Sequence, residues 1–179
     1  MRQSILLVLM IASVATAQDN VAALEKLRAL AGDWQGSLQW TGARTGSGPV
    51  NASYYETGNG SAVVENLIMG GVPSMTSVYH LDGSDLRMTH YCGAQNQPRL
   101  KASRIDLEQG ALDFKFVDIT NLKSPEAGHV VGVELRFLAA DHIILTFQFE
   151  GAGKTSRERI DLKRVAAKSA ASPSAPDTH

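Results

Sequence analysis

The chain has 179 residues, in which 17 Lys and Arg side chains nearly balance 18 Asp and Glu side chains, for a formal net charge of −1. This balance excludes the electrostatic footprint of a nucleic-acid-binding protein or of one held on an anionic membrane surface. The single cysteine, Cys92, has no partner within the chain, so a disulfide framework is excluded too. A hydrophobic core must therefore stabilise the fold.

Residues 1–17 are typical of a secretory signal peptide. Arg2 supplies a positive charge, residues 5–14 form an apolar stretch, and Ala15-Thr16-Ala17 is a small-residue cleavage pattern. The apolar stretch is too short to span a bilayer comfortably. The sequence thus predicts a periplasmic or secreted protein with no membrane insertion after signal cleavage.

The other end of the chain, residues 166–179, is small, polar and proline-containing, and is predicted to be a disordered tail. Residues 18–165 then form one predicted domain. Its first element is a short amphipathic helix over about residues 21–31, where leucines recur at spacings of three until Gly32 ends the pattern.

After Gly32 the hydrophobic period changes to that of a strand around Trp34, followed by a Gly-rich turn over residues 41–49. Nine further alternating runs, separated by turn residues, predict strands at 50–56, 62–69, 75–81, 86–92, 99–107, 111–118, 130–138, 142–150 and 156–165. Closing such a meander removes the two edges of an open sheet. We predict an all-β, antiparallel up-and-down β-barrel of about ten strands, with a two-sheet sandwich as the alternative.

The runs 75–81 and 86–92 flank Asp82-Gly83-Ser84-Asp85 and predict a β-hairpin. Pairing Leu81 with Leu86 places the following side chains on one face, which the alternation predicts to be interior: Met75, Ser77, Tyr79, Leu81, Leu86, Met88, His90 and Cys92.

His90 is the candidate with the widest chemistry, because an imidazole can bind a ligand, coordinate haem iron or act as an acid or base near neutral pH. The alternative is a buried histidine that is hydrogen-bonded to Ser77 or Tyr79. The segment Asn96-Gln97-Pro98-Arg99 offers amides and a guanidinium that could recognise a carboxylate or carbonyl at the barrel mouth. Alternatively, it is a turn that satisfies its own backbone.

A short helix followed by Gly32-Asp33-Trp34 resembles the G-x-W signature of calycins, the lipocalin-like barrels. The resemblance implies that Trp34 closes the barrel floor against an arginine of the last strand. Here that arginine is Arg164, which shares a strand face with Ile160 and Leu162.

The central segments Tyr79–Gly83, Thr89–Cys92 and Asn96–Arg99 resemble those of uncharacterised secreted bacterial proteins that are related to ten-stranded, nitrobindin-type barrels. The nitrobindin comparison implies a haem site with a late histidine ligand. The late histidines of this chain are His129, in a predicted loop, and His142, at a predicted strand start.

The leading expectation is a barrel that binds a small hydrophobic or amphipathic molecule in its interior, with no cofactor or metal and with haem as the alternative. The predicted ligand-binding residues are His90, Tyr79, Met88, Met75, Cys92, Asn96 and Arg99.

Two alternatives stay open. One is an enzyme that uses His90 as general acid or base, with a carboxylate such as Glu56 or Glu65 whose position the sequence does not give. The other is a barrel filled by its own side chains. The charged residues Arg157, Glu158, Arg159 and Asp161 are predicted to form a solvated face.

Overall fold

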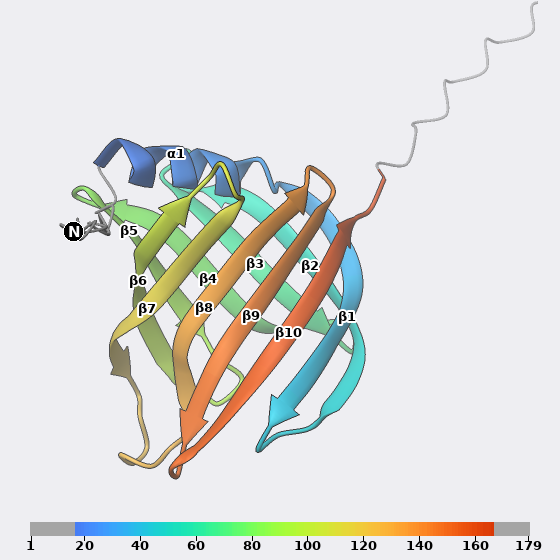
Figure 1. Ribbon diagram of the computed structural model, residues 1–179, viewed down its shortest axis with the longest axis vertical. Coiled ribbons are helices and arrows are strands. Elements are labelled where there is room, and N and C mark those ends of the chain that lie inside the picture. Colours follow the sequence, from blue (N-terminus) through green and yellow to red (C-terminus); the bar gives the residue numbers. More distant parts are fainter. Residues whose placement is uncertain (1–16, 167–179) are drawn as a thin grey trace, which may run out of the picture.

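The computed structural model describes residues 17–166, which form a closed antiparallel barrel of ten strands with one helix across one end (Figure 1). The elements are α1 (Ala17–Arg28), β1 (Gly32–Gly42), β2 (Gly46–Thr57), β3 (Ala62–Met69), β4 (Val72–Asp82), β5 (Asp85–Tyr91), β6 (Gln97–Asp106), β7 (Ala111–Thr120), β8 (His129–Ala139), β9 (His142–Gly151) and β10 (Lys154–Arg164). Each strand pairs with the next, and β1 closes the ring on β10. The predicted fold class is confirmed, and the sandwich alternative is wrong.

The predicted signal peptide, apart from Ala17, and the predicted tail, apart from Ala166, lie outside the described residues and stay predictions. Within residues 17–166, no helix is long and apolar enough to cross a membrane.

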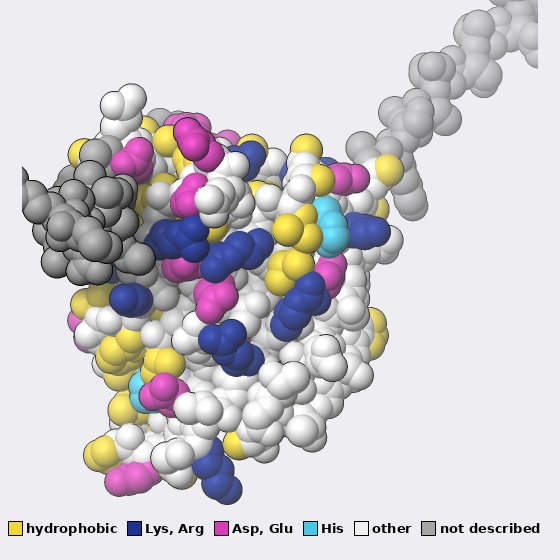
Figure 2. All heavy atoms as spheres, viewed as in Figure 1, with side chains coloured by type: hydrophobic (Ala, Val, Ile, Leu, Met, Phe, Trp, Pro, Cys, Tyr) yellow, Lys and Arg dark blue, Asp and Glu magenta, His cyan; other side chains and the backbone are white. Residues whose placement is uncertain are grey.

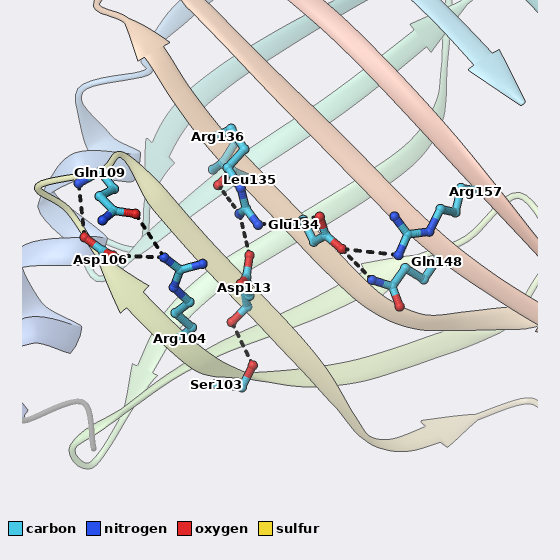
Figure 3. Close-up of polar contacts among 10 residues, drawn as sticks. All are labelled: Ser103, Arg104, Asp106, Gln109, Asp113, Glu134, Leu135, Arg136, Gln148 and Arg157. Carbon is cyan, nitrogen blue, oxygen red and sulfur yellow. Dashed lines mark hydrogen bonds and ion pairs between the residues drawn. The ribbon is translucent and has the colours of Figure 1, made fainter. Parts of the chain in front are cut away.

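Strand alternation decides which side chains enter the barrel. On β9, for example, Ile143, Leu145, Phe147 and Phe149 are buried, whereas the residues between them are only partly covered. The outward faces of the later strands carry basic and acidic side chains interspersed (Figure 2). A polar chain crosses from β7 to β10 on this side, where Asp113 binds Arg136 and Glu134 bonds to Gln148 (Figure 3). The inside is mostly apolar and the outside is solvated, as expected for one closed sheet.

Helix α1 covers residues 17–28 instead of the predicted 21–31, and side chains from the sheet bind the carbonyl groups of the residues that follow it. The Trp34 indole Nε1–H donates to the Leu30 carbonyl at 2.8 Å. The Arg164 guanidinium donates to the carbonyls of Ala29 at 2.7 Å and Ala31 at 2.6 Å. These bonds satisfy carbonyls that a longer helix would have used internally, and they turn the chain into β1.

The same guanidinium lies over the Trp34 ring, with 4.4 Å between Arg164 Cζ and the ring centroid. Trp34 and Arg164 are direct partners in the β1–β10 ladder, and Trp34 is 1% exposed. Close contact of these two strands also requires Gly36, because a Cβ there would lie 1.8 Å from the Asp161 carbonyl oxygen. The helix-covered end of the barrel is thereby closed by an aromatic ring and a cation.

The β4–β5 hairpin has the predicted register. Leu81 pairs with Leu86, Tyr79 with Met88, and Ser77 with His90. Its turn is tighter than predicted, because Asp82 and Asp85 already pair and only Gly83 and Ser84 lie between them.

The predicted turn over residues 41–49 is wrong in extent. Strand β1 continues to Gly42 and β2 starts at Gly46, so the turn contains only Ala43, Arg44 and Thr45. The glycines of this segment favoured the prediction of a loop, but the backbone of Gly46 and Gly48 takes part in the β1–β2 ladder. The shorter turn carries Arg44 to the barrel end opposite α1.

We predict that Arg164→Ala lowers the free energy of unfolding by about 1–3 kcal/mol, because it removes a cation–π contact and hydrogen bonds to the end of α1. Urea denaturation followed by tryptophan fluorescence measures the change. Lys163→Ala, an exposed substitution on the same strand, is the matched control. Equal midpoints for the two variants would contradict a structural role for this closure.

Candidate functional site

A row of polar side chains crosses four neighbouring strands inside the barrel. Tyr54 on β2 pairs with Glu65 on β3, Glu65 pairs with Ser77 on β4, and Ser77 pairs with His90 on β5. Glu65, Ser77 and His90 are each 0% exposed, and Tyr54 is 2% exposed. Directly paired residues point to the same face of a sheet, so the register alone brings these groups into contact.

Three hydroxyl groups converge on the Glu65 carboxyl group. The Tyr54 and Tyr79 hydroxyls donate to Oε2 at 2.8 and 3.0 Å, and the Ser77 hydroxyl donates to Oε1 at 3.1 Å. Burial raises the pKa of Glu65, and the three hydrogen bonds oppose that rise by stabilising the carboxylate. Burial, reinforced by the neighbouring carboxylate, also raises the pKa values of Tyr54 and Tyr79 well above their usual range. Both phenols therefore stay protonated donors.

Only one of the two nitrogen atoms of the His90 imidazole has a hydrogen-bond partner within residues 17–166. Its Nδ1 lies 3.0 Å from the Ser77 hydroxyl, and its ring packs against Phe147 of β9 with centroids 4.9 Å apart. Its Nε2 is buried and has no hydrogen-bond partner among residues 17–166. Burial lowers the pKa of His90 to about 4, so the ring is neutral at neutral pH.

The tautomer of His90 follows from its neighbours. Because the Ser77 proton is used on Glu65, the Ser77 oxygen is free to accept a hydrogen bond from Nδ1–H. The unpartnered Nε2 then carries a lone pair. Nε2 can therefore accept a hydrogen bond or a proton.

His90 lines a cavity of about 280 Å³ at the barrel end opposite α1. The turns β1–β2 and β5–β6 form part of its rim, and both lie at the lower end of the barrel in Figure 1. The other lining residues are mostly apolar: Trp40, Arg44, Met69, Ser74, Met75, Cys92, Gly93, Ala94, Val130, Phe147, Phe149 and Glu158.

Two charged groups face this cavity, one at its wall and one at its rim. Glu158 is 3% exposed, and it pairs across the sheet with Trp40 on one side and Phe147 on the other. Burial raises the pKa of Glu158 to about 7, although Arg44 and the Trp40 side chain oppose the rise. The Arg44 guanidinium packs over the Phe149 ring, 3.8 Å from its centroid.

The structure brings only part of the predicted set together. His90, Met75 and Cys92 line the cavity. Tyr79 lies behind them and bonds to Glu65 rather than lining the cavity, and Met88 is fully buried in the core.

Asn96 and Arg99, the other two members of the set, do not line this cavity. Asn96 is buried, and its amide donates to the Gly128 carbonyl at 3.0 Å. Arg99 lies on the outside of the barrel and binds Asp118. Outward alternation on β6 explains its position.

The late histidines also lie apart from the cavity. His142 bonds to Asp161 at 2.8 Å, and the Nδ1 atom of His129 lies 3.0 Å from the Ala127 carbonyl. No group of three or more His, Cys, Asp or Glu side chains is placed to hold a metal ion in the part of the chain that the structure describes.

The prediction of a solvated charged face on the last strand is wrong for one member. Arg157 and Arg159 are exposed and Asp161 is partly exposed, but Glu158 is buried. Glu158 stands two residues before Ile160, so the alternation that directs Ile160 inward also directs Glu158 inward. Glu65 stands in the same way between the buried residues Val63 and Leu67. For both residues, the signal in the sequence that predicts burial is an acidic side chain at an inward-facing strand position.

We predict that the stability difference between Glu158→Gln and the wild type depends on pH. Because the folded pKa of about 7 is above the usual 4.5, the wild type loses stability as pH rises from about 4.5 to 7. Glutamine does not titrate, so the variant should gain about 2–3 kcal/mol relative to the wild type across this window.

Denaturant unfolding at a series of pH values measures this difference. Glu150→Gln, on the neighbouring strand β9 and exposed, is the control. A difference between Glu158→Gln and the wild type that does not change with pH would contradict the burial of this carboxyl group.

No protein-family model matches the chain, and no curated protein matches it. Among solved structures, it is similar to a protein of unknown function from the DUF3598 family of Nostoc punctiforme, with a TM-score of 0.53, 12% identity, and 78% of this chain and 49% of that chain covered. The chain thus spans about half the length of that protein.

It is also similar to Rv2717c from M. tuberculosis, with a TM-score of 0.52, 14% identity, and 80% of this chain and 98% of that chain covered. A looser likeness, with a TM-score of 0.45 and 10% identity, is to an S-type phycobiliprotein lyase from Guillardia theta, with 82% and 94% covered. At these identities, the first two likenesses show a shared β-barrel fold.

Proposed function

We propose that this protein binds a small hydrophobic or amphipathic molecule in the cavity at the barrel end opposite α1. The observation that carries the proposal is the combination of an apolar-walled cavity with a buried imidazole nitrogen that lacks a partner. A buried acceptor without a hydrogen bond costs about 1–3 kcal/mol. A guest with an N–H or O–H group would remove that cost while its apolar body leaves water.

The volume of the cavity supports a small guest. Pockets for drug-sized ligands measure about 300–1,000 Å³, and this cavity of about 280 Å³ lies just below that range. His90 Nε2 has the lone pair that a haem-iron ligand needs, but a cavity of this volume is too small to enclose a haem macrocycle.

The polar groups at the cavity support an amphipathic guest over a purely apolar one. His90 offers an acceptor, Glu158 offers a carboxyl group that is partly protonated near neutral pH, and Arg44 offers a cation at the rim. The wall between them consists of aromatic rings and methionines. We propose further that binding takes place in the periplasm or outside the cell, where the predicted signal peptide would direct the protein.

We predict that the wild type binds indole, an apolar ring with one N–H donor, in isothermal titration calorimetry. Ala94→Phe places a ring at the cavity wall and should weaken indole binding by about tenfold or more, or about 1.4 kcal/mol. Ala43→Phe adds the same ring at an exposed position of the β1–β2 turn whose own side chain does not line the cavity, and it should leave the affinity unchanged.

Native mass spectrometry of protein from its own host gives an independent readout and should show a co-purifying small molecule. A wild type that binds no indole and carries no small molecule would contradict the proposed function.

A further inference from the structure

The polar row behind the cavity offers more chemistry than ligand binding requires. An apolar pocket needs one or two polar groups at its surface. Here a further chain continues from His90 through Ser77 to a carboxylate, each link made at 3.0–3.1 Å. A charged group that is fully enclosed costs several kcal/mol even after it is well bonded.

We infer that Glu65, Ser77 and His90 form a proton relay that accepts the proton of a weakly acidic ligand, so that a phenol-like guest is bound as its anion. This inference rests on the proposed function and names the class of ligand. The guest is an apolar ring with one acidic O–H.

The transfer moves three protons by one position each. The ligand O–H bond breaks as Nε2 of His90 takes its proton, Nδ1–H passes to the Ser77 oxygen, and the original Ser77 proton passes to Oε1 of Glu65. The ring changes tautomer and stays neutral throughout. The products are a ligand anion that accepts a hydrogen bond from Nε2–H and a neutral Glu65.

The direction of this transfer has a physical cause. Before it, the negative charge is on Glu65 in the carboxylate form that its three hydroxyl donors stabilise. This side chain is 0% exposed, and burial raises its pKa, so its enclosed position disfavours the charge. After it, the charge is in the cavity that Arg44 also lines. The charge leaves a fully enclosed site for one that faces a cation, while the neutral tautomer change avoids a buried imidazolium.

Other titratable groups lie close to this path. Tyr54 and Tyr79 hold Glu65 from β2 and β4, and burial keeps both protonated. In the cavity, Glu158 is a second carboxyl group that could take a ligand proton directly, and burial raises the pKa of the Cys92 thiol. A test of the relay must therefore separate Glu65 from Glu158 and from the field of Arg44.

The probe is 4-nitrophenol, whose absorption moves to longer wavelength on ionisation, measured about one pH unit below its own pKa so that most free probe is protonated. Wild-type protein should show the phenolate band in proportion to bound probe. Glu65→Gln and Ser77→Ala should bind the probe without that band. The exposed control Glu56→Gln should keep it. Glu158 lines the cavity, so Glu158→Gln is read only by whether the probe that it binds is ionised.

A phenolate band that persists in Glu65→Gln and Ser77→Ala would show that Arg44 alone ionises the probe, and would overturn the relay. A band lost in Glu158→Gln but kept in Glu65→Gln would assign the proton to Glu158 and also overturn it. If the wild type binds the probe only in its protonated form, the relay is overturned too.

The matched ether 4-nitroanisole has no acidic proton. If it binds and 4-nitrophenol does not, the relay fails and the proposed function stands. Binding of neither overturns the relay, and it overturns the proposed function as well only if indole also fails to bind and no small molecule co-purifies.

Nitrogen-15 NMR of the wild-type imidazole tests the relay without any variant. Nδ1–H is expected in the free protein and Nε2–H in the complex with 4-nitrophenol, with a neutral ring in both. A cationic His90 in the complex would show that the proton stops at the ring, and would overturn the relay.

Discussion

The need to satisfy one enclosed carboxyl group determines how the chemistry of this barrel is arranged. Glu65 has no contact with water, so its oxygens must find donors within the protein. Three hydroxyls supply them, and each of those side chains is thereby confined to one orientation. Ser77 also contacts Nδ1 of His90, which leaves Nε2 without a hydrogen-bond partner among the described residues. The orientation of the His90 ring is thus linked to a buried carboxyl group two strands away.

The two ends of the barrel perform different tasks because different side chains occupy them. At the α1 end, the Trp34 ring, the Arg164 cation and the helix carbonyls form a closed, fully bonded floor. At the opposite end, large aromatic rings line a space that they do not fill. A closed sheet has no edges at which to place a ligand site, so the free space at this end is where a guest can enter.

Burial shifts the pKa values of His90 and Glu158, two titratable groups that line the cavity, in opposite directions. It disfavours charge in each case, so it lowers the pKa of His90 to about 4 and raises that of Glu158 to about 7. Between these values the protein keeps a neutral base and a largely neutral acid in one apolar space. Two groups in such states can bind a guest through hydrogen bonds without a fixed charge beside its apolar part. Among the described residues that line this cavity, Arg44 at the rim is the one Lys or Arg.

Sequence alone determined the architecture of this protein and the interior face of its central hairpin. Alternating runs with turn residues between them allow few arrangements, and closure is the one that leaves no exposed edge. The same alternation predicts that His90, Glu65 and Glu158 point inward, since each stands two residues from an apolar residue that is buried.

Alternation does not specify which strands face each other across the barrel or where the interior is left unfilled. Tertiary structure decided that Phe147 of β9 packs on His90, that Arg44 reaches the rim of the cavity, and that Tyr79 donates to Glu65 instead of lining the cavity. These outcomes depend on the curvature and register of ten strands together, which no short stretch of sequence specifies.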